Sequence, residues 1–212
     1  MPVETLVVGP LETNCFVVWG EGDTDALVID AGGDADRIAD AIESRGLVPR
    51  VLFMTHGHID HIAANEKLKA RYPDMEHAIL ESERDLLMRP TLNLSLFLGG
   101  GVKPPEPSRL FTEGDELAVG PLRFRVLHLP GHTPGGAGLS GEIEGERVVF
   151  AGDTLFAGSI GRSDFPGGDG EVLIASIREK LFPLPDETRV LSGHGPETTV
   201  GAERRHNPFL AG

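Results

Sequence analysis

Cysteine is nearly absent from this chain of 212 residues. Cys15 is the single example, so no disulfide can form within the chain and a Cys-rich zinc finger is excluded. A metal site in this chain would have to be built from histidine and carboxylate side chains. The scarcity of thiols is also typical of a protein of the reducing cytoplasm.

Positive charge is scarce as well. The 19 lysines and arginines are outnumbered by 33 aspartates and glutamates, which gives a formal net charge of −14. This excess of negative charge is unfavourable for binding the phosphates of nucleic acid or an anionic membrane. No apolar run is long enough to cross a bilayer, and the N-terminus lacks the basic and apolar regions of a secretory signal. We therefore expect a cytoplasmic protein that binds neither nucleic acid nor a membrane.

The composition that remains is typical of a globular protein, with 40% hydrophobic and 25% charged residues. Its length suits one domain over residues 1–212. Apolar periodicity and turn residues predict strands at 3–8, 15–19, 26–30, 51–54, 116–119, 122–127, 138–143, 147–151 and 189–192, and helices at 34–45, 60–72, 171–181 and 199–206. This order favours two packed sheets with helices on their outer faces. Segment 81–107 has no clear period, and it can be interpreted as a lid over a substrate or as a packed connector.

The most informative segment is T-H-G-H-I-D-H, from Thr55 to His61. It places three histidines and an aspartate within six residues, directly after an apolar run: His56, His58, Asp60 and His61. Imidazole and carboxylate groups are the usual ligands of a catalytic divalent metal, and four ligands exceed what one open site takes from so short a stretch. The alternative is a polar loop with solvated histidines, in which Asp60 caps the next helix.

Three later residues share a local pattern in which a predicted strand ends beside glycine: His132, Asp153 and His194. Each alone is typical of a turn. Together with the first segment they make seven candidate ligands, too many for one tetrahedral zinc and suited to two ions about 3.5 Å apart. His77, His128 and His206 do not share the pattern, and we interpret them as structural or solvated, with His128 near enough to support His132.

The segments T-H-G-H-I-D-H, P-G-H-T-P-G, G-D-T-L-F and S-G-H-G-P occur in an order that resembles the metallo-β-lactamase superfamily, from Asp30 to His194. The resemblance implies an α+β fold, an αβ/βα sandwich of two mixed β-sheets with helices on the outer faces. It assigns His56, His58 and His132 to one ion. It assigns Asp60, His61 and His194 to a second ion, with Asp153 bridging both. The implied cofactors are two divalent ions, with zinc as the first expectation and iron or manganese as alternatives.

Within this superfamily, G-D-T-L-F-A-G-S-I-G-R-S-D-F-P most resembles the glyoxalase II (hydroxyacylglutathione hydrolase) branch, in a short form without the helical C-terminal extension. The implied reaction is hydrolysis of S-D-lactoylglutathione, or a related small acyl-thiol, by a metal-bound hydroxide. Asp60 would both bind metal and orient the nucleophile, which makes it the catalytic candidate.

Two departures from the glyoxalase II pattern concern the substrate. Pro196 occupies the place of a glutathione-binding tyrosine, and Arg162-Ser163-Asp164 occupies the place of Lys-x-Tyr. Arg162 is the candidate for pairing with a substrate carboxylate, and its alternative is a surface ion pair. These departures therefore bear on the recognition of glutathione more than on the hydrolysis of the thioester.

Three other functions stay open. Persulfide dioxygenases resemble this chain in the G-R-S-D-F segment and use one iron held by the equivalents of His56, His132 and Asp153. A lactam or lactone could be hydrolysed at the same two-metal site. The third alternative is a metal-binding module without catalysis. The sequence leaves the oligomeric state open.

Overall fold

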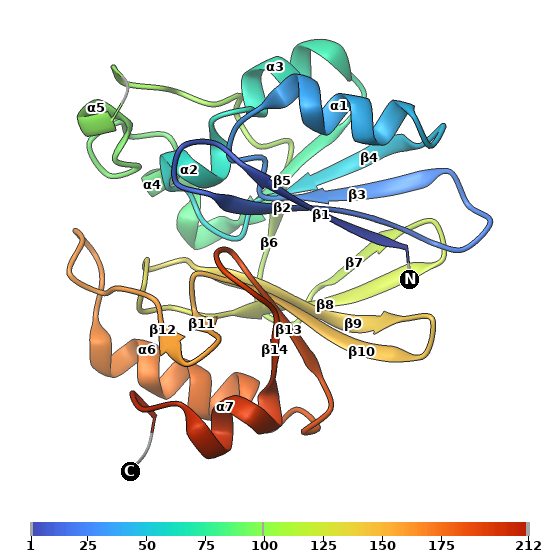
Figure 1. The fold of residues 1–212 in the computed structure, drawn as a ribbon. Helices are drawn as coiled ribbons and strands as arrows, with labels where there is room; N and C mark the ends of the chain where they lie inside the picture. The colour runs from blue at the N-terminus through green and yellow to red at the C-terminus, as the bar shows by residue number, and fades with distance from the viewer. Residues whose placement is uncertain (1, 99, 211–212) are drawn as a thin grey trace.

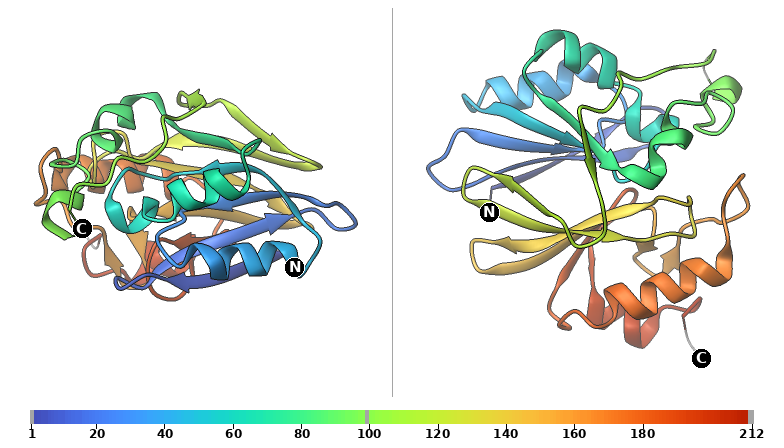
Figure 2. Two further views of the ribbon diagram at one scale, coloured as in Figure 1. Left: turned by 90° about the horizontal axis from the view of Figure 1, so that it is seen from above. Right: turned by 180° about the vertical axis from the view of Figure 1, so that it is seen from behind.

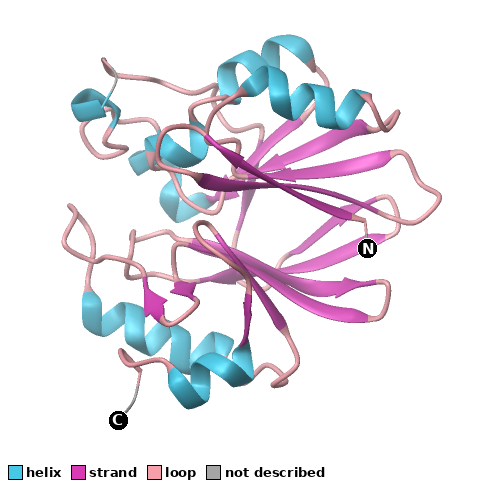
Figure 3. Ribbon diagram, viewed as in Figure 1, coloured by secondary structure: helices cyan, strands magenta, loops and turns pink. Residues whose placement is uncertain are grey.

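The computed structural model describes residues 2–98 and 100–210. Two six-stranded sheets pack face to face, and helices cover the outer face of each sheet (Figures 1 and 3). Both sheets are mixed, so the predicted α+β sandwich of two mixed β-sheets is confirmed. The chain crosses from the first sheet to the second between β6 and β7, along the back of the molecule (Figure 2).

The first sheet has the order β1-β2-β3-β4-β5-β6. Its strands are β1 (Val3–Val8), β2 (Thr13–Trp19), β3 (Asp25–Ile29), β4 (Val48–Phe53), β5 (Glu76–Leu80) and β6 (Arg109–Phe111). The first two pairings are antiparallel and the other three are parallel. The carboxyl ends of β3 to β6 therefore meet at one edge of the sheet, where binding residues gather in open sheets of this kind.

The second sheet has the order β14-β13-β10-β9-β8-β7, with β10 and β13 parallel. Its strands are β7 (Glu116–Val119), β8 (Leu122–His128), β9 (Ala137–Ile143), β10 (Glu146–Gly152), β13 (Arg189–Ser192) and β14 (Thr198–Thr199). A small antiparallel pair follows β10 and consists of β11 (Leu155–Phe156) and β12 (Ser159–Ile160). In Figure 1 this pair lies at the edge that faces α2 (Ile59–Ile62).

Helices α1 (Ala35–Glu43) and α3 (Asn65–Arg71) cover the first sheet, and α6 (Gly170–Ser176) and α7 (Val200–His206) cover the second (Figure 1). Helix α6 continues as a wider helical turn over Ile177–Leu181. Among the described residues, no helix has both the length and the apolar character needed to cross a membrane.

The alternation of side chains along each strand explains why both faces of the first sheet are buried. In β3, Leu27 and Ile29 face the second sheet, whereas Ala26 and Val28 pack under the helices. The inner faces of the two sheets meet through aromatic contacts, with the ring of Phe16 5.2 Å from that of Phe150. Strands buried on both faces appear in the sequence as continuous apolar runs, which is why β3 and β4 were predictable.

The structure differs from the prediction in two places, and it also defines segment 81–107, which the sequence left open. The helix predicted over 60–72 is split into α2 and α3, because the N–H of Ala64 donates to the carbonyl of Ala31 (2.9 Å) rather than within a helix. Strands β5, β6, β11, β12 and β14 were not predicted, since they are short and carry polar or charged neighbours. Segment 81–107 connects β5 to β6 and contains a short 3₁₀ turn (Glu81–Glu83), α4 (Arg84–Leu87) and α5 (Ser95–Leu98).

Candidate metal centre

All seven predicted ligands lie at one edge of the sandwich, where strands from both sheets end. His56 and His58 follow β4, Asp60 and His61 lie in α2, and His132 lies between β8 and β9. Asp153 follows β10, and His194 follows β13. Their ligand atoms form three overlapping groups: His56 with His58 and His132, His56 with His61 and Asp153, and Asp60 with His61 and His194. The structure therefore brings together residues from four separate parts of the chain.

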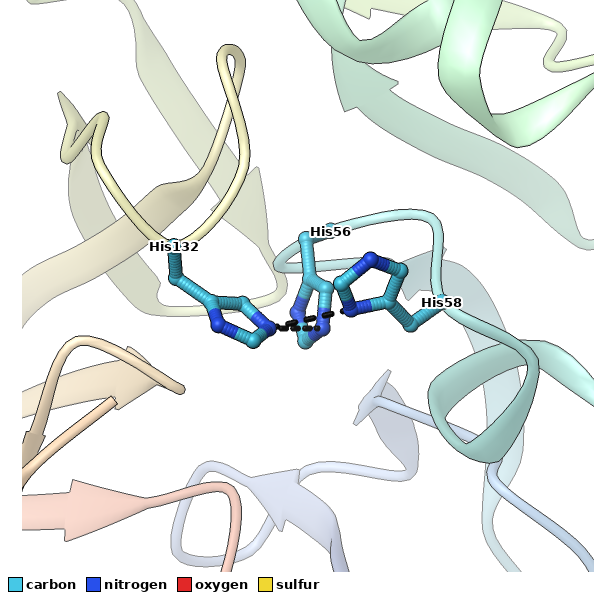
Figure 4. A group of neighbouring side chains, drawn as sticks. All are labelled: His56, His58 and His132. Carbon is cyan, nitrogen blue, oxygen red and sulfur yellow. Dashed lines mark hydrogen bonds between the residues drawn. The ribbon is translucent and has the colours of Figure 1, made fainter. Parts of the chain in front are cut away.

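The first group consists of three buried histidines whose rings point toward one another (Figure 4). Nδ1 of His58 lies 3.0 Å from Nε2 of His132, and the same Nε2 lies 3.2 Å from Nε2 of His56. Nitrogen ligands about 2.0–2.1 Å from a tetrahedral zinc are about 3.3 Å apart. The three nitrogens thus converge at the spacing that one metal ion requires.

The group of Asp60, His61 and His194, called the second group from here on, lies beside the first and includes a carboxylate. Oδ2 of Asp60 is 3.2 Å from Nε2 of His194 and 3.5 Å from Nε2 of His61. Asp153 stands between the groups, because Oδ1 is 3.4 Å from Nε2 of His61 and Oδ2 is 3.8 Å from Nε2 of His132. This is the position expected of a carboxylate that bridges two ions.

Unpartnered polar atoms provide a test of whether a metal fits. Among the described residues, Nε2 of His61 and Oδ1 of Asp153 are buried and have no hydrogen-bond partner. Buried polar atoms normally have partners, since leaving them without one costs free energy. Both atoms face the cluster, and a cation would satisfy both. The residues present therefore fit divalent metal ions.

Two contacts orient ligand rings from behind. Nδ1 of His132 lies 2.7 Å from the carbonyl oxygen of Arg162, and Nδ1 of His61 lies 3.0 Å from Oδ2 of Asp30. The buried carboxylate of Asp30 also accepts hydrogen bonds from N–H (2.8 Å) and Oγ1 (2.7 Å) of Thr55. When Nδ1 donates to such a partner, Nε2 is left with a lone pair for metal. The sequence analysis did not assign Asp30 this role, and its place directly after a buried strand was the available signal.

Electrostatics divide the cluster into two parts. Burial lowers the pKa of His56, and the neighbouring histidines lower it further. Burial, followed by the charge of His132, lowers the pKa of His58 to about 3. These two rings are therefore neutral at pH 7 and can donate lone pairs.

The second group behaves in the opposite way. Burial opposes a charge on His61, but Asp153, Asp30 and Asp60 outweigh it and raise the pKa of His61 well above its ordinary value. For Asp60, burial would raise the pKa, but His61 and His194 outweigh it and lower the pKa. A metal ion that binds here must displace protons from imidazole.

A cleft of about 450 Å³ opens above the cluster. Apart from the ligands, its lining is largely apolar: Leu11, Leu94, Phe156, Ile160 and Phe165, with Ser159 and Arg162 as polar members. Segment 81–107 therefore contributes to the cleft through Leu94, in addition to connecting two strands. The dimensions suit a small molecule whose reacting group lies on the cluster.

Arg162 forms the ion pair that the sequence analysis gave as its alternative role, and its predicted role in binding a substrate carboxylate stays a prediction. It lines the cleft, and its guanidinium forms a two-pronged ion pair with Asp164, with both N···O distances at 2.7 Å. The guanidinium also stacks on Phe165, 3.8 Å from the ring centroid. A substrate carboxylate would have to share Arg162 with Asp164.

The remaining histidines lie outside the cluster, as predicted. His77 is buried in β5, and His206 is exposed at the end of α7. Nε2 of His128 lies 2.9 Å from the carbonyl oxygen of Pro134, in the loop that carries His132. His128 therefore supports that loop and does not face the metal groups.

Comparison with known proteins agrees with this geometry. The model of the Metallo-beta-lactamase superfamily matches residues 8–194. The chain is 42% identical to hydroxyacylglutathione hydrolase GloC of Haemophilus influenzae, across 99% of this chain and 98% of that protein.

Two solved structures are similar over nearly the whole chain. The BLEG-1 B3 metallo-beta-lactamase has a TM-score of 0.91 and 39% identity, covering 99% of this chain and all of that one. TTHA1623, in a di-iron-bound form, has a TM-score of 0.85 and 37% identity, covering 98% of this chain and all of that one.

Proposed function

The chain belongs to the metallo-beta-lactamase superfamily, and on this basis we propose that it is a two-metal hydrolase of small acyl thioesters, with S-D-lactoylglutathione as the first substrate to test. The observation that carries the proposal is the position of Asp153 between two groups of ligand atoms at the floor of a cleft. The similarity to a hydroxyacylglutathione hydrolase over nearly the full chain supports a thioester as the bond that is hydrolysed.

The proposed ligands follow the two groups. One ion would be held by His56, His58 and His132, and the other by Asp60, His61 and His194, with Asp153 touching both. When bound, divalent ions supply Lewis acidity and lower the pKa of coordinated water to about 7. A mixed set of imidazole and carboxylate ligands accepts zinc, iron or manganese. We propose zinc first and iron second, since a structure 37% identical is di-iron-bound.

Asp60 is the proposed catalytic carboxylate. Its lowered pKa keeps it ionised at neutral pH, and it borders the cleft. Thr13 Oγ1 donates to Oδ2 of Asp60 at 3.4 Å and helps to fix its direction. An ionised carboxylate in this place can accept a hydrogen bond from the attacking water and orient it toward the substrate carbonyl.

The walls of the cleft perform the remaining tasks. Phe156 and Ile160, with the other apolar residues of the lining, would hold the acyl-thiol and exclude bulk water from the carbonyl. A thiolate is a stable leaving group, so the cleft needs no strong acid above the cluster. We propose that Arg162 binds a carboxylate of the thiol portion by exchanging its partner Asp164 for the substrate.

A second candidate is hydrolysis of a β-lactam at the same cluster. The similarity to the BLEG-1 B3 metallo-beta-lactamase, with a TM-score of 0.91, favours it. A mononuclear persulfide dioxygenase is less well supported. In such an enzyme His58, His61 and His194 would bind no metal, although their ligand atoms converge with those of the other candidate ligands.

The test is a set of parallel assays on protein whose metal content has been measured. We expect hydrolysis of S-D-lactoylglutathione by the parent and its loss in His58→Ala, whereas His206→Ala, which changes an exposed histidine outside the cluster, keeps the activity. Hydrolysis of a chromogenic β-lactam without thioester hydrolysis would establish the second candidate instead. Oxygen consumption with glutathione persulfide, or full thioesterase activity in His58→Ala, would overturn the two-metal mechanism.

A further inference from the structure

The segment Glu81–Leu87, formed by the short 3₁₀ turn and α4, packs directly against both loops that carry the first ligand group. Gly57 lies between two ligands, and a Cβ atom there would be 2.8 Å from Cα of Leu87. Gly135 follows His132 by three residues, and a Cβ atom there would be 2.4 Å from the backbone nitrogen of Glu83. Real Cβ atoms do not approach backbone so closely, so glycine is required at both positions for this contact.

The close approach allows one side chain to reach both loops. Glu83 is fully buried, with 0% of its surface exposed. One carboxylate oxygen accepts the N–H of Gly57 at 3.1 Å, and the other accepts the N–H of Gly135 at 2.7 Å. Within residues 2–98 and 100–210, no lysine, arginine or histidine forms an ion pair with Glu83. Two backbone donors, together with the side chain of Thr133, take the place of a cation.

Only a side chain with two acceptors suits this position. Both partners are N–H groups, so each must meet an oxygen. Glutamine has the same shape but offers one oxygen, and its amide N–H₂ would face a second N–H. A buried carboxylate also costs the fold several kcal/mol unless its charge is well hydrogen-bonded. A requirement for two fixed acceptors explains why a carboxylate is buried here.

The two loops are the ones whose spacing defines the first ligand group. The first loop carries His56 and His58, and its base is joined to the second by the bond from the N–H of Ala137 to the carbonyl of Thr55 (2.8 Å). The second loop is closed by the bond from the N–H of Leu129 to the carbonyl of Gly136 (2.7 Å), with His132 near its tip. Glu83 adds a second link, at the residue between His56 and His58.

We propose that Glu83 is a positioning residue of the metal centre: its carboxylate fixes the two ligand loops relative to each other, so that the nitrogens of His56, His58 and His132 converge before a metal binds. The inference rests on the metal centre proposed above. It makes segment 81–87 a support for the ligand loops. Because Glu83 acts through the loops, its effect must be visible in metal binding and not only in turnover.

Glu83→Gln tests the proposal, with metal affinity measured by competition between the protein and a chromogenic chelator for Zn²⁺. The matched control is Glu203→Gln, which changes another buried glutamate whose oxygens accept from Gly158, Thr198 and Asn207, none of which is a proposed ligand. We expect Glu83→Gln to bind the first Zn²⁺ more weakly by roughly 10- to 100-fold, as for other residues that orient metal ligands. Glu203→Gln should lose stability but keep the affinity of the parent.

Two further measurements separate positioning from a general loss of structure. In Co²⁺-loaded protein, the visible ligand-field spectrum should change in Glu83→Gln and stay unchanged in Glu203→Gln. In the metal-free parent, the amide protons of Gly57 and Gly135 should exchange slowly with solvent, which can be measured even if Glu83→Gln does not fold. Parental Zn²⁺ affinity and an unchanged cobalt spectrum in Glu83→Gln, or rapid exchange of both amides, would overturn the proposal. A parent that binds no metal at all would instead overturn the proposed function.

Discussion

Asp30→Asn should weaken the second ligand group more than the first, because Asp30 contacts His61 directly and reaches His56 only through Thr55. In the parent, Nδ1 of His61 lies 3.0 Å from Oδ2 of Asp30, so the proton on Nδ1 should stay there when a metal displaces the proton on Nε2. Nε2 then presents its lone pair toward Asp60 and Asp153. An asparagine amide N–H₂ in the place of Oδ2 would donate to Nδ1 and leave the proton on Nε2, where the metal should bind.

The contacts of Asp30 determine how much stability and metal affinity Asp30→Asn should lose. If the asparagine keeps its oxygen on the N–H of Thr55 (2.8 Å in the parent), His61 takes the wrong tautomer. If the amide flips, its N–H₂ faces the N–H of Thr55 in a buried site. Only the flipped amide leaves a buried donor unpaired in the metal-free protein, which costs about 1–3 kcal/mol, because in the first arrangement the proton on Nε2 of His61 faces the carboxylates of Asp60 and Asp153. We expect at most that loss in the free energy of unfolding of the metal-free protein, and a loss of roughly 10- to 100-fold in the affinity of the second ion.

The assay is a two-site Zn²⁺ titration with metal quantified after equilibrium dialysis. The affinity for the first ion should fall less than that for the second, since His58 and His132 keep their contacts and only His56 is reached, through Thr55. Glu203→Gln again serves as the control for a disturbed buried carboxylate away from the cluster. If Asp30→Asn binds two ions as tightly as the parent, the argument that Asp30 selects the tautomer of His61 is refuted.

Three other predictions follow from particular side chains. Both ring nitrogens of His77 are buried and have no hydrogen-bond partner among the described residues, and burial followed by Lys69 lowers the pKa of His77 to about 4. The unfolded chain therefore binds more protons than the folded chain between that value and about 6.5. His77→Leu should remove about 2 kcal/mol of the stability that the metal-free parent loses between pH 7 and pH 5, measured by urea unfolding. An equal pH dependence in parent and variant would contradict this. Burial raises the pKa of the Cys15 thiol, so an alkylating reagent at pH 8 should modify Cys15 only in denaturant, as mass spectrometry would detect. Asp164→Asn should free Arg162 from its ion pair and lower KM for S-D-lactoylglutathione with kcat little changed. Arg162→Ala should raise KM. If neither substitution changes KM, Arg162 does not bind the substrate.

Much of the fold was predictable because its strands are buried on both faces. Runs such as Leu27–Ile29 and Val51–Phe53 can only be accommodated in a sheet covered on both sides, and hairpins with glycine turns are evident in the second half. The short strands β5 and β6 were missed, because three to five residues carry too weak a period when their pairing partners are distant in sequence. The break between α2 and α3 was missed for a similar reason, since it depends on a bond from Ala64 to Ala31.

The sequence by itself determined the candidate ligands. Histidine and carboxylate chemistry, the spacing of His56 to His61 and the glycine-flanked strand ends were sufficient to select all seven residues that the structure brings together. It also contained a single cysteine and so excluded a Cys-rich zinc finger.

Only the tertiary structure decided how these ligands are held and what lies above them. Asp30 and Glu83 act through atoms 25 to 52 positions away in the chain, and no local pattern encodes such contacts. The apolar lining of the cleft likewise depends on loops that meet only when the two sheets pack. Ligand chemistry belongs to individual residues and can be recognised along the chain, whereas the orientation of ligands belongs to the contacts that folding creates.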